Sequence, residues 1–329
     1  MKILAVDDDP IILELLTQFV SLTGEHELVT CLSGPEALEV AGAATKEPFD
    51  CFLFDIQMPE MDGIVLTHTI REMAMYSDTP ILMLTAMSDK RYVDAAFAAG
   101  ATDYVTKPFE LADLKGRLGL VSGLVTARRS HTRKIFAAQS LAASALPEQP
   151  ASSLELHEPI SIYDVDYVID YFAMENYVAQ LSRTALFGST TFAFTIRKIA
   201  EHHQAMSAFE FFSLVSDVSE IISDVLADHQ FLMSYAGGGT FVCVTESGWS
   251  PDMPKLMDAI NLALSRTELF DNAGQQLYVR VSAGDAIRMI WKPESLIMET
   301  IGMAHASAEA ASERHERAMN DFWLEERRA

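Results

Sequence analysis

Short apolar runs alternate with amphipathic stretches along the first 120 or so residues of the chain. The runs, which predict buried strands, span 3–6, 28–32, 51–54, 81–84 and 104–105. Between them, stretches such as 11–22 and 92–99 carry apolar residues at helical spacing. Five strand–helix units in this order predict an α/β domain with a parallel, doubly wound sheet. In such a sheet the reactive groups collect at the carboxyl ends of the strands.

A helical pattern continues after the fifth unit and contains a short seam of apolar residues. Leu111, Leu114, Leu118, Val121 and Val125 recur at alternating spacings of three and four residues, as in a coiled coil. The seam extends over about two heptads, which is shorter than the assignment of a coiled coil requires. Two interpretations stand: a coiled-coil extension, or a last helix that packs on its own sheet.

A proline-containing segment separates this region from a second globular region. Residues 143–160 hold three prolines and are predicted to be an inter-domain linker. We therefore expect an N-terminal domain at 1–120, a helical extension and linker at 121–160, and a C-terminal domain at 161–329.

The elements of the second region follow from its apolar pattern. The expected order is a helix at 163–186, a strand at 191–196, two helical segments, a hairpin of strands 231–235 and 240–245, a helix at 253–269, a strand at 276–283 and a terminal helix.

The balance of charge narrows the classes of partner. The chain carries 47 acidic and 24 basic residues, a formal charge of −23. Such a surface repels phosphate backbones and anionic lipids, so we expect neither a nucleic-acid nor a membrane partner. The three cysteines lie far apart and form no metal-binding pattern. The chain opens with a strand pattern instead of a signal peptide, and we therefore expect a cytoplasmic protein.

Polar side chains follow four of the strands predicted for the first domain. They are Asp7, Asp8 and Asp9 after the first strand, Asp55 after the third, Thr85 after the fourth and Lys107 after the fifth. An acidic run alone is also typical of a helix N-cap. Clustered carboxylates repel one another unless a cation lies between them, and hard oxygen ligands suit Mg²⁺. A carboxylate beside such a metal can attack phosphorus, and a lysine and a hydroxyl can stabilise the phosphoryl oxygens.

These motifs resemble the receiver domain of two-component response regulators. The resemblance is carried by VDDDP at 6–10, DIQMPEMDG at 55–63, LTA at 84–86 and AGATDYVTKPF at 99–109. It covers about residues 1–120 and implies a flavodoxin-like (βα)5 fold. It also implies that Asp55 accepts a phosphoryl group from a histidine kinase or a histidine phosphotransfer protein.

The same resemblance implies a metal site and a switch. Mg²⁺, or Mn²⁺, would be held by Asp7, Asp8, Asp55 and the backbone carbonyl of Gln57. Lys107 and Thr85 would bind the phosphoryl oxygens. Tyr104 would change rotamer together with Thr85, so that these two residues form the switch.

The second region resembles, more diffusely, the GGDEF domain of diguanylate cyclases. The order of its elements and the run VSAG at 281–284 carry the resemblance, which covers roughly 161–320. So does the turn formed by Gly237, Gly238, Gly239, Thr240 and Phe241. The resemblance implies an α/β domain with a central mixed sheet.

The cyclase chemistry of that family is not matched in this chain. Cyclisation of GTP needs two divalent ions held by carboxylates of the first strand and the signature turn. Here those positions are Thr195, Arg197 and Gly239. Arginine repels a metal ion, so we expect a degenerate domain without cyclase activity.

Three functional interpretations follow from these observations. The first is a phosphorelay adaptor without enzyme activity, in which phosphorylation of Asp55 produces a homodimer or a surface for an unknown protein partner. The alternative is a divergent diguanylate cyclase, or an effector domain that binds GTP or a cyclic dinucleotide. A phosphate sink, in which the C-terminal domain is only structural, is the third, and it predicts fast dephosphorylation.

We predict slow autodephosphorylation. In receiver domains the residues two positions after the phosphoacceptor and after the threonine influence how water reaches the acyl phosphate, and here they are Gln57 and Met87. The apolar Met87 cannot orient a water molecule, so Met87→Glu should shorten the lifetime of the phosphorylated protein, followed as loss of radiolabelled phosphate. An unchanged lifetime in Met87→Glu or Gln57→Asn would reduce Met87 to an apolar residue at a helix start with no kinetic role.

Overall fold

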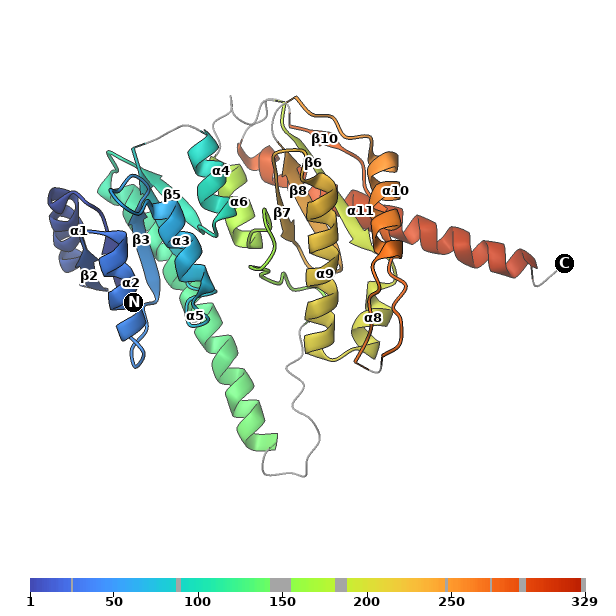
Figure 1. The fold of residues 1–329 in the computed structure, drawn as a ribbon, viewed down its shortest axis with the longest axis horizontal. Coiled ribbons are helices and arrows are strands. Elements are labelled where there is room, and N and C mark those ends of the chain that lie inside the picture. The colour runs from blue at the N-terminus through green and yellow to red at the C-terminus, as the bar shows by residue number, and fades with distance from the viewer. Residues whose placement is uncertain are drawn as a thin grey trace. The chain divides into compact units, whose positions relative to one another are not determined.

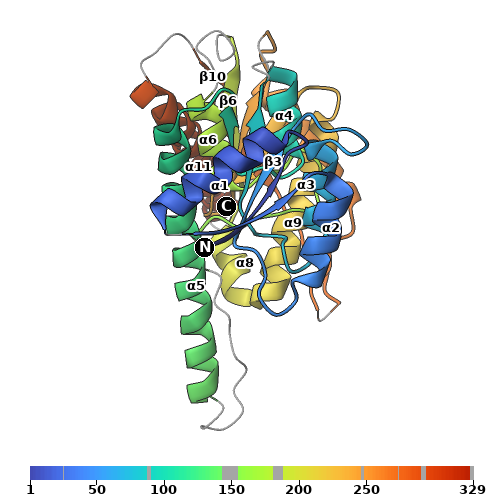
Figure 2. The same ribbon diagram turned by 90° about the vertical axis from the view of Figure 1, so that its left-hand side faces the viewer.

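The computed structural model describes residues 1–24, 26–86, 90–142, 155–180, 188–245, 248–272, 274–289 and 294–326. The chain divides into two units, residues 1–150 and residues 151–329, coloured blue to green and green to red in Figures 1 and 2. Within the described ranges, no helix combines the length and the apolar character that crossing a bilayer requires.

The first unit alternates strands and helices throughout. In chain order its elements are β1 (Lys2–Val6), α1 (Pro10–Thr23), β2 (Glu27–Cys31), α2 (Gly34–Ala43), β3 (Cys51–Asp55), α3 (Gly63–Glu72), β4 (Ile81–Thr85), α4 (Lys90–Ala98), β5 (Asp103–Thr106) and α5 (Leu111–Ala142).

The five strands form one parallel sheet in the order β2-β1-β3-β4-β5. The apolar runs of β3 and β4 are buried on both faces of the sheet, which is why they read as continuous apolar stretches. The order reverses direction next to β1, so β1 and β3 lie side by side at the switch point. The predicted parallel, doubly wound sheet is confirmed.

The helices cover both faces of this sheet, and side-chain alternation along the strands decides which face each residue serves. Leu4, Phe52 and Met83 pack on the face covered by α2, α3 and α4. Ile3 and Leu53 pack on the opposite face, which α1 and α5 cover. Each face therefore has its own apolar core.

Helix α5 settles the two interpretations of the apolar seam. Leu114, Leu118, Val121 and Val125 are all buried in the core under α1 and α5, whereas Leu111 is 45 % exposed. The seam packs on its own sheet as far as Val125. The helix continues to Ala142 (Figure 2).

The second unit has a different alternation of elements. In chain order they are α6 (Tyr171–Gln180), β6 (Thr190–Ile196), α8 (Ile199–Ala205), α9 (Ala208–Leu226), β7 (Phe231–Tyr235), β8 (Thr240–Thr245), α10 (Met253–Arg266), β9 (Val281–Ala283), β10 (Ile287–Arg288) and α11 (Glu294–Glu326).

The sheet of the second unit is antiparallel, so the predicted mixed sheet is wrong. Its order is β10-β6-β8-β7, and β9 pairs with the same edge of β6 as β10. The crossover through α8 and α9 does bring β7 back parallel to β6. The β7–β8 hairpin then inserts β8 between these two strands, which makes every named pair antiparallel. Among the described residues, the one parallel contact of this unit is an isolated bridge between Val168 and Met233.

Two other expected elements differ from the structure. Residues 163–170 are not helical, because Tyr167 has a left-handed backbone (φ 64°) and Val168 bridges to β7. The helix begins only after Asp170, whose carboxylate accepts the backbone N–H of Phe172 at 2.9 Å.

The expected strand 276–283 is shortened to β9, because Gln276 bridges to Phe270 outside the main sheet. Residues 181–186 of the expected helix and 143–154 of the expected linker lie outside the described residues.

The two faces of the second sheet have different chemistry. Phe192, Phe194 and Ile196 of β6 point into a large apolar core with α9 and α10. The alternate residues Thr191, Ala193 and Thr195 lie on the opposite face, where α11 crosses β6, β8 and β9. There a Cβ atom on Gly284 would lie 2.7 Å from the backbone nitrogen of Ala308, so α11 packs directly on the strand edge.

Two leucines of α5 allow a matched test of this packing. Leu118 is 2 % exposed in the core, and Leu120 is 57 % exposed on the same helix. We expect Leu118→Ala to lower the free energy of unfolding of the first unit by about 2–5 kcal/mol, because it leaves a cavity. Leu120→Ala should change it by less than about 0.5 kcal/mol. Urea unfolding followed by far-UV circular dichroism would measure both, and equal effects would contradict the packing of the seam.

Candidate functional site: an acidic pocket with one lysine

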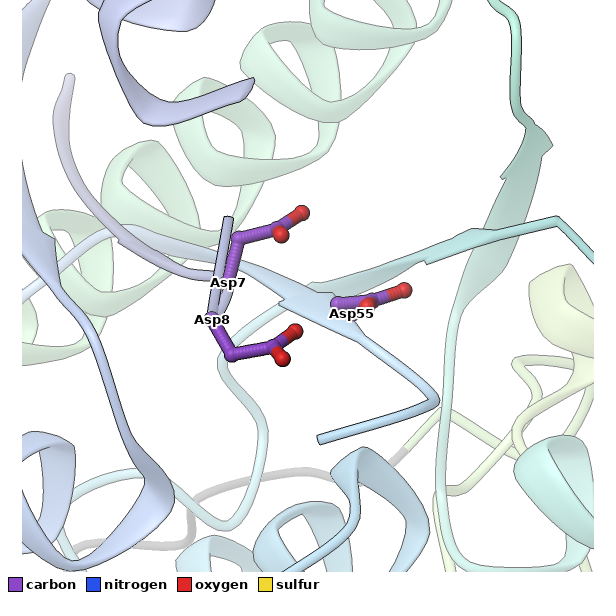
Figure 3. A group of neighbouring side chains, drawn as sticks. All are labelled: Asp7, Asp8 and Asp55. Carbon is purple, nitrogen blue, oxygen red and sulfur yellow. The ribbon is translucent and has the colours of Figure 1, made fainter. Parts of the chain in front are cut away.

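Three aspartates meet at the carboxyl edge of the first sheet. Asp7 directly follows β1, and Asp55 is the last residue of β3, the strand that pairs with β1. Oxygen atoms of Asp7, Asp8 and Asp55 lie within 4.8 Å of one another, and the three side chains project to the same side of the sheet (Figure 3). Asp7 and Asp55 are buried, whereas Asp8 is exposed. The sequence placed these residues at one edge, and the structure brings them together.

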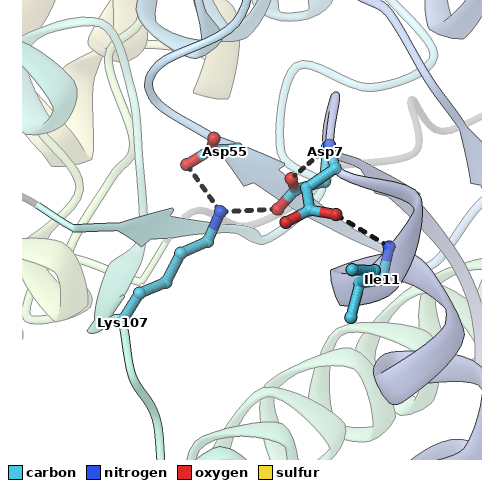
Figure 4. A network of polar contacts seen from close by, with 5 residues as sticks. Asp7, Ile11, Asp55 and Lys107 are labelled. Carbon is cyan, nitrogen blue, oxygen red and sulfur yellow. Dashed lines mark hydrogen bonds and ion pairs between the residues drawn. The ribbon is translucent and has the colours of Figure 1, made fainter.

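Lys107 joins the two buried carboxylates. Its Nζ lies 2.6 Å from Oδ2 of Asp7 and 3.0 Å from Oδ1 of Asp55 (Figure 4). The lysine directly follows β5, and its backbone N–H donates to the carbonyl of Thr85 at 2.6 Å. The ends of β1, β3 and β5 thus position Asp7, Asp55 and Lys107. The ammonium group of Lys107, which is the predicted partner of phosphoryl oxygens, bridges the two carboxylates in this structure.

The three aspartates that follow β1 have different structural roles. Asp9 is the N-cap of α1 and accepts the backbone N–H of Ile11 at 2.8 Å. Asp7 accepts the backbone N–H of Asp9 at 3.0 Å (Figure 4). The N-cap interpretation therefore holds for Asp9 alone, and Asp7 and Asp8 remain directed at the pocket.

Burial in this pocket disfavours the ionised form of the Asp55 carboxyl. Burial raises its pKa above the ordinary value, and the neighbouring charge of Asp7 adds a smaller effect in the same direction. The ammonium of Lys107 and the backbone N–H of Gln57 act in the opposite direction, but they do not offset the loss of solvation. The pocket thus combines three carboxyl groups with one ammonium group in a place where burial disfavours charge.

The loop after β3 returns to the site through a close backbone approach. The N–H of Gly63 donates to the carbonyl of Ile56 at 3.0 Å, and Asp62 caps α3 by accepting the N–H of Val65 at 2.8 Å. A Cβ atom on Gly63 would lie 2.0 Å from the carbonyl oxygen of Asp55. Sequence reasoning quoted this glycine within a motif but did not identify its steric role.

The expected switch residues lie on one face of the sheet. Thr85 ends β4 and is fully buried, and its backbone pairs with Thr106 of β5. Tyr104 pairs with Met83, two residues before Thr85, so both side chains are on the face that α4 covers. The ring of Tyr104 meets that of Phe97 of α4 edge to face, with centroids 6.2 Å apart. Met87 lies outside the described residues.

Two arginines that the sequence reasoning missed support the opposite, amino edge of the sheet, where β4 and β5 begin. Arg117 of α5 pairs with the buried Asp103 of β5 at 2.7 Å and with Asp113 at 3.3 Å. Arg71 of α3 donates to the carbonyls of Gly100, Tyr76 and Thr79. The spacing of Asp113 and Arg117, one helical turn apart, was the only signal available beforehand.

Comparison with known proteins identifies the fold that holds this pocket. A family model described as "Response regulator receiver domain" matches residues 3–119. Residues 3–119 form a response regulator receiver domain. The match ends there, and it does not assign residues 120–329 to a family.

Relatives of the receiver domain include two curated transcriptional regulatory proteins. The proteins are PrrA of Mycobacterium tuberculosis, 38 % identical over 117 residues, and CrdR of Helicobacter pylori, 34 % identical over 117 residues. The match covers 36 % of this chain in both cases, and 48 % and 53 % of the relatives. The chain thus spans about half the length of these relatives. A solved structure of the chemotaxis response regulator CheY4 of Vibrio cholerae is 35 % identical, with a TM-score of 0.34, and it covers 36 % of this chain and 97 % of that one.

The glycine turn of the second unit uses its backbone donors internally. Gly237, Gly238 and Gly239 all have positive φ angles, of 89°, 60° and 78°. The N–H of Gly238 donates to the carbonyl of Leu156 at 2.7 Å, and the N–H of Gly239 donates to the hydroxyl of Tyr235 at 3.0 Å. The N–H of Thr240 donates to Gly237 at 3.0 Å. These three groups are therefore not directed at a ligand.

The positions where the cyclase resemblance expects metal ligands carry other chemistry. Thr195 and Thr240 share a buried hydrogen bond of 2.9 Å between their hydroxyls. The carbonyl of Gly239 accepts the N–H of Ile196 at 2.8 Å, and Phe241 is buried beside Tyr235. Within the described part of the chain, the one cluster of three or more potential metal-binding side chains is the aspartate group of the receiver domain.

The raised pKa of Asp55 predicts a measurable effect of its charge. A raised pKa means that the folded protein binds the proton more tightly than the unfolded chain, so stability falls as the pH rises from about 4 through the pKa of the folded state. Without divalent ions at neutral pH, Asp55→Asn should therefore melt at a higher temperature than the wild type, and the difference should vanish toward pH 4. Differential scanning fluorimetry would measure it. Asp8→Asn, which removes an exposed charge from the same pocket, should have a smaller effect, and a larger one would contradict the argument.

Proposed function

We propose that this protein is a phosphorelay response regulator whose Asp55 accepts a phosphoryl group. The observation that carries the proposal is the position of Asp55: it shares a pocket with two other aspartates, and its Oδ1 lies 3.0 Å from the Lys107 ammonium. The donor is a histidine kinase or a histidine phosphotransfer protein, as the receiver domain implies.

The donor set fits a hard divalent cation. Asp7, Asp8 and Asp55 supply oxygen ligands, and these three carboxyl groups share the pocket with one ammonium group, that of Lys107. Oxygen-only sites of this kind suit Mg²⁺ or Mn²⁺. The backbone carbonyl of Gln57, in the loop that follows Asp55, is the further ligand that we propose. When bound, the ion would neutralise charge between the carboxylates and the incoming phosphoryl group.

The transfer needs little beyond positioning and charge. A carboxylate oxygen of Asp55 forms the new O–P bond while the bond from phosphorus to the imidazole nitrogen of the donor breaks. The electron pair of the broken bond stays on that nitrogen, which takes up a proton from water and leaves a neutral histidine. Lys107 moves its contact from the Asp55 carboxylate to a phosphoryl oxygen. Thr85, at the end of the neighbouring strand, donates its hydroxyl to another oxygen.

The switch follows from the face that Thr85 and Tyr104 share. When Thr85 turns toward the phosphoryl group, the space that its side chain leaves lies on the α4 side of the sheet. Tyr104, which contacts Phe97 of α4 by the edge of its ring, can then change rotamer. This couples a local charge to the surface around α4 and β5.

We further propose that the second unit is a catalytically silent, GGDEF-like output domain. Support comes from its strand order, with β8 inserted between the parallel β6 and β7, and from the internal use of the glycine-turn donors. Arg197 and Thr195 in place of acidic residues also support it. Phosphorylation would act through self-association or through a protein partner. The alternative, a divergent cyclase or nucleotide-binding domain, rests on the same strand order.

Light scattering with a phosphoryl mimic tests the switch. Beryllofluoride with Mg²⁺ should convert the wild-type full chain from monomer to dimer, and Asp55→Asn should remain unchanged. An unaltered mass together with unaltered hydrogen exchange around α4 and β5 would overturn the switch. An altered exchange without dimerisation would mean that a protein partner reads the surface.

Incubation with GTP and Mg²⁺ or Mn²⁺ tests the silent domain separately. We expect no cyclic dinucleotide, with or without beryllofluoride, by liquid chromatography and mass spectrometry. Turnover that Asp55→Asn abolishes would show a regulated cyclase and would overturn the adaptor proposal.

A further inference from the structure

An arginine at the end of β6 has no carboxylate partner among the residues that the structure describes. Arg197 is half-buried, and its Nε donates to the hydroxyl of Ser282 at 2.9 Å. Its Nη2 reaches the thioether sulfur of Met257 at 3.8 Å, which is a weak acceptor. Nη1 has no hydrogen-bond partner, and no carboxylate oxygen lies within 4.0 Å of the guanidinium, among the residues that the structure describes.

A second arginine lies beside it on the neighbouring strand segment. The backbone N–H of Arg197 donates to the carbonyl of Arg280 at 2.8 Å, which places the two residues next to each other. Burial lowers the pKa of Arg197, and the positive charge of Arg280 lowers it further. The side chain of Arg280 is exposed and makes no ion pair with a described residue.

The acidic residue that affects the pKa of Arg197, Glu316, forms its hydrogen bonds with other groups. Glu316 acts on Arg197 through space and raises its pKa, but its Oε1 accepts the backbone N–H of Lys198 at 2.9 Å and the hydroxyl of Ser312 at 3.4 Å. Although the chain has 47 acidic and only 24 basic residues, these two adjacent arginines form no ion pair with a described residue. A half-buried charge without a counter-ion costs stability, so the arrangement leaves a position for an anion.

The residues around Arg197 hold its guanidinium in place. The hydroxyl of Ser282 also bonds Nδ1 of His315 from α11 at 2.9 Å, so β6, β9 and α11 are joined at this point. Burial, and then the charge of Arg197, lower the pKa of His315. Ser282 is fully buried and fixes Nε, and Nη2 contacts only the weak acceptor sulfur of Met257, so neither Nη1 nor Nη2 has an oxygen acceptor among the described residues. The outer nitrogens of a planar guanidinium bind tetrahedral oxyanions through paired hydrogen bonds.

We propose that Arg197 and Arg280 form a binding site for a phosphate group, free or carried by a small ester. Two adjacent guanidinium groups match the two negative charges of a phosphate monoester, whereas a single carboxylate would neutralise only one of them. The site lies where the cyclase resemblance expects metal-binding acidic residues, and it carries positive charge where those residues would carry negative charge. It depends neither on phosphorylation of Asp55 nor on cyclase activity.

Isothermal titration calorimetry of the full chain in EDTA tests this proposal, because EDTA removes the divalent ions that a receiver pocket would need. The probes are inorganic phosphate, pyrophosphate and adenosine monophosphate. We expect Arg197→Gln and Arg280→Gln each to weaken binding by roughly tenfold or more. Arg288→Gln is the matched control, because it removes an exposed arginine from β10 of the same sheet, and it should bind as the wild type does.

The outcomes separate the sources of the anion. Tighter binding of adenosine monophosphate than of inorganic phosphate would identify a small ester as the ligand, and equal binding would identify free phosphate. Binding that persists in Arg197→Gln, or no binding of any probe by the wild type at millimolar concentration, would overturn the proposal. If circular dichroism shows that Arg197→Gln is unfolded, Arg280→Gln decides alone, because its side chain is exposed.

Discussion

The contact of one ammonium group with two buried carboxylates organises the receiver domain. Lys107, Asp7 and Asp55 come from the ends of three different strands, and the parallel sheet brings those ends to one edge. The contact with the lysine does not offset burial, which still raises the pKa of Asp55. Three carboxyl groups and one ammonium group are thus brought together where charge is poorly solvated. A cation and a phosphoryl group would each relieve a part of that imbalance, and both would do so at the same atoms.

Much of the receiver domain could be predicted from the sequence because its signals are local and agree with one another. Each buried strand is a continuous apolar run, and each functional side chain follows such a run directly. Once the sheet is parallel, the positions of Asp7, Asp55, Thr85 and Lys107 follow from it. Capping of α1 by Asp9 has a local signal in Pro10, which begins the helix, but the approach of Asp7 and Asp8 to Asp55 depends on the pairing of distant strands. The partners of Arg71 and Arg117 depend on contacts between distant segments in the same way.

The second unit was harder to predict because its order in space differs from its order in the chain. The pattern correctly gives β6, two helices, and the hairpin of β7 and β8. It does not tell which member of the hairpin lies next to β6, and that choice alone turns an expected mixed sheet into an antiparallel one. A similar non-local effect ends the expected helix near Tyr167, where the chain turns to bridge β7. The lack of acidic residues at Thr195 and Arg197, where the cyclase resemblance expects them, was visible in the sequence. The contacts of these residues were not: Thr195 shares a hydroxyl hydrogen bond with Thr240, and Arg197 pairs with no acid among the described residues.

The close approach of Gly63 to the carbonyl of Asp55 has a consequence for the tolerance of the domain to substitution. The first residue of α3 and the last residue of β3 are in backbone contact, so the position of one limits the position of the other. A side chain at position 63 would displace the backbone of Asp55 before it met any other obstacle. In a saturation scan scored by signalling, position 63 would therefore be as intolerant as position 55, although its own atoms take no part in the chemistry. The accuracy of the pocket is thus set partly by the absence of a side chain.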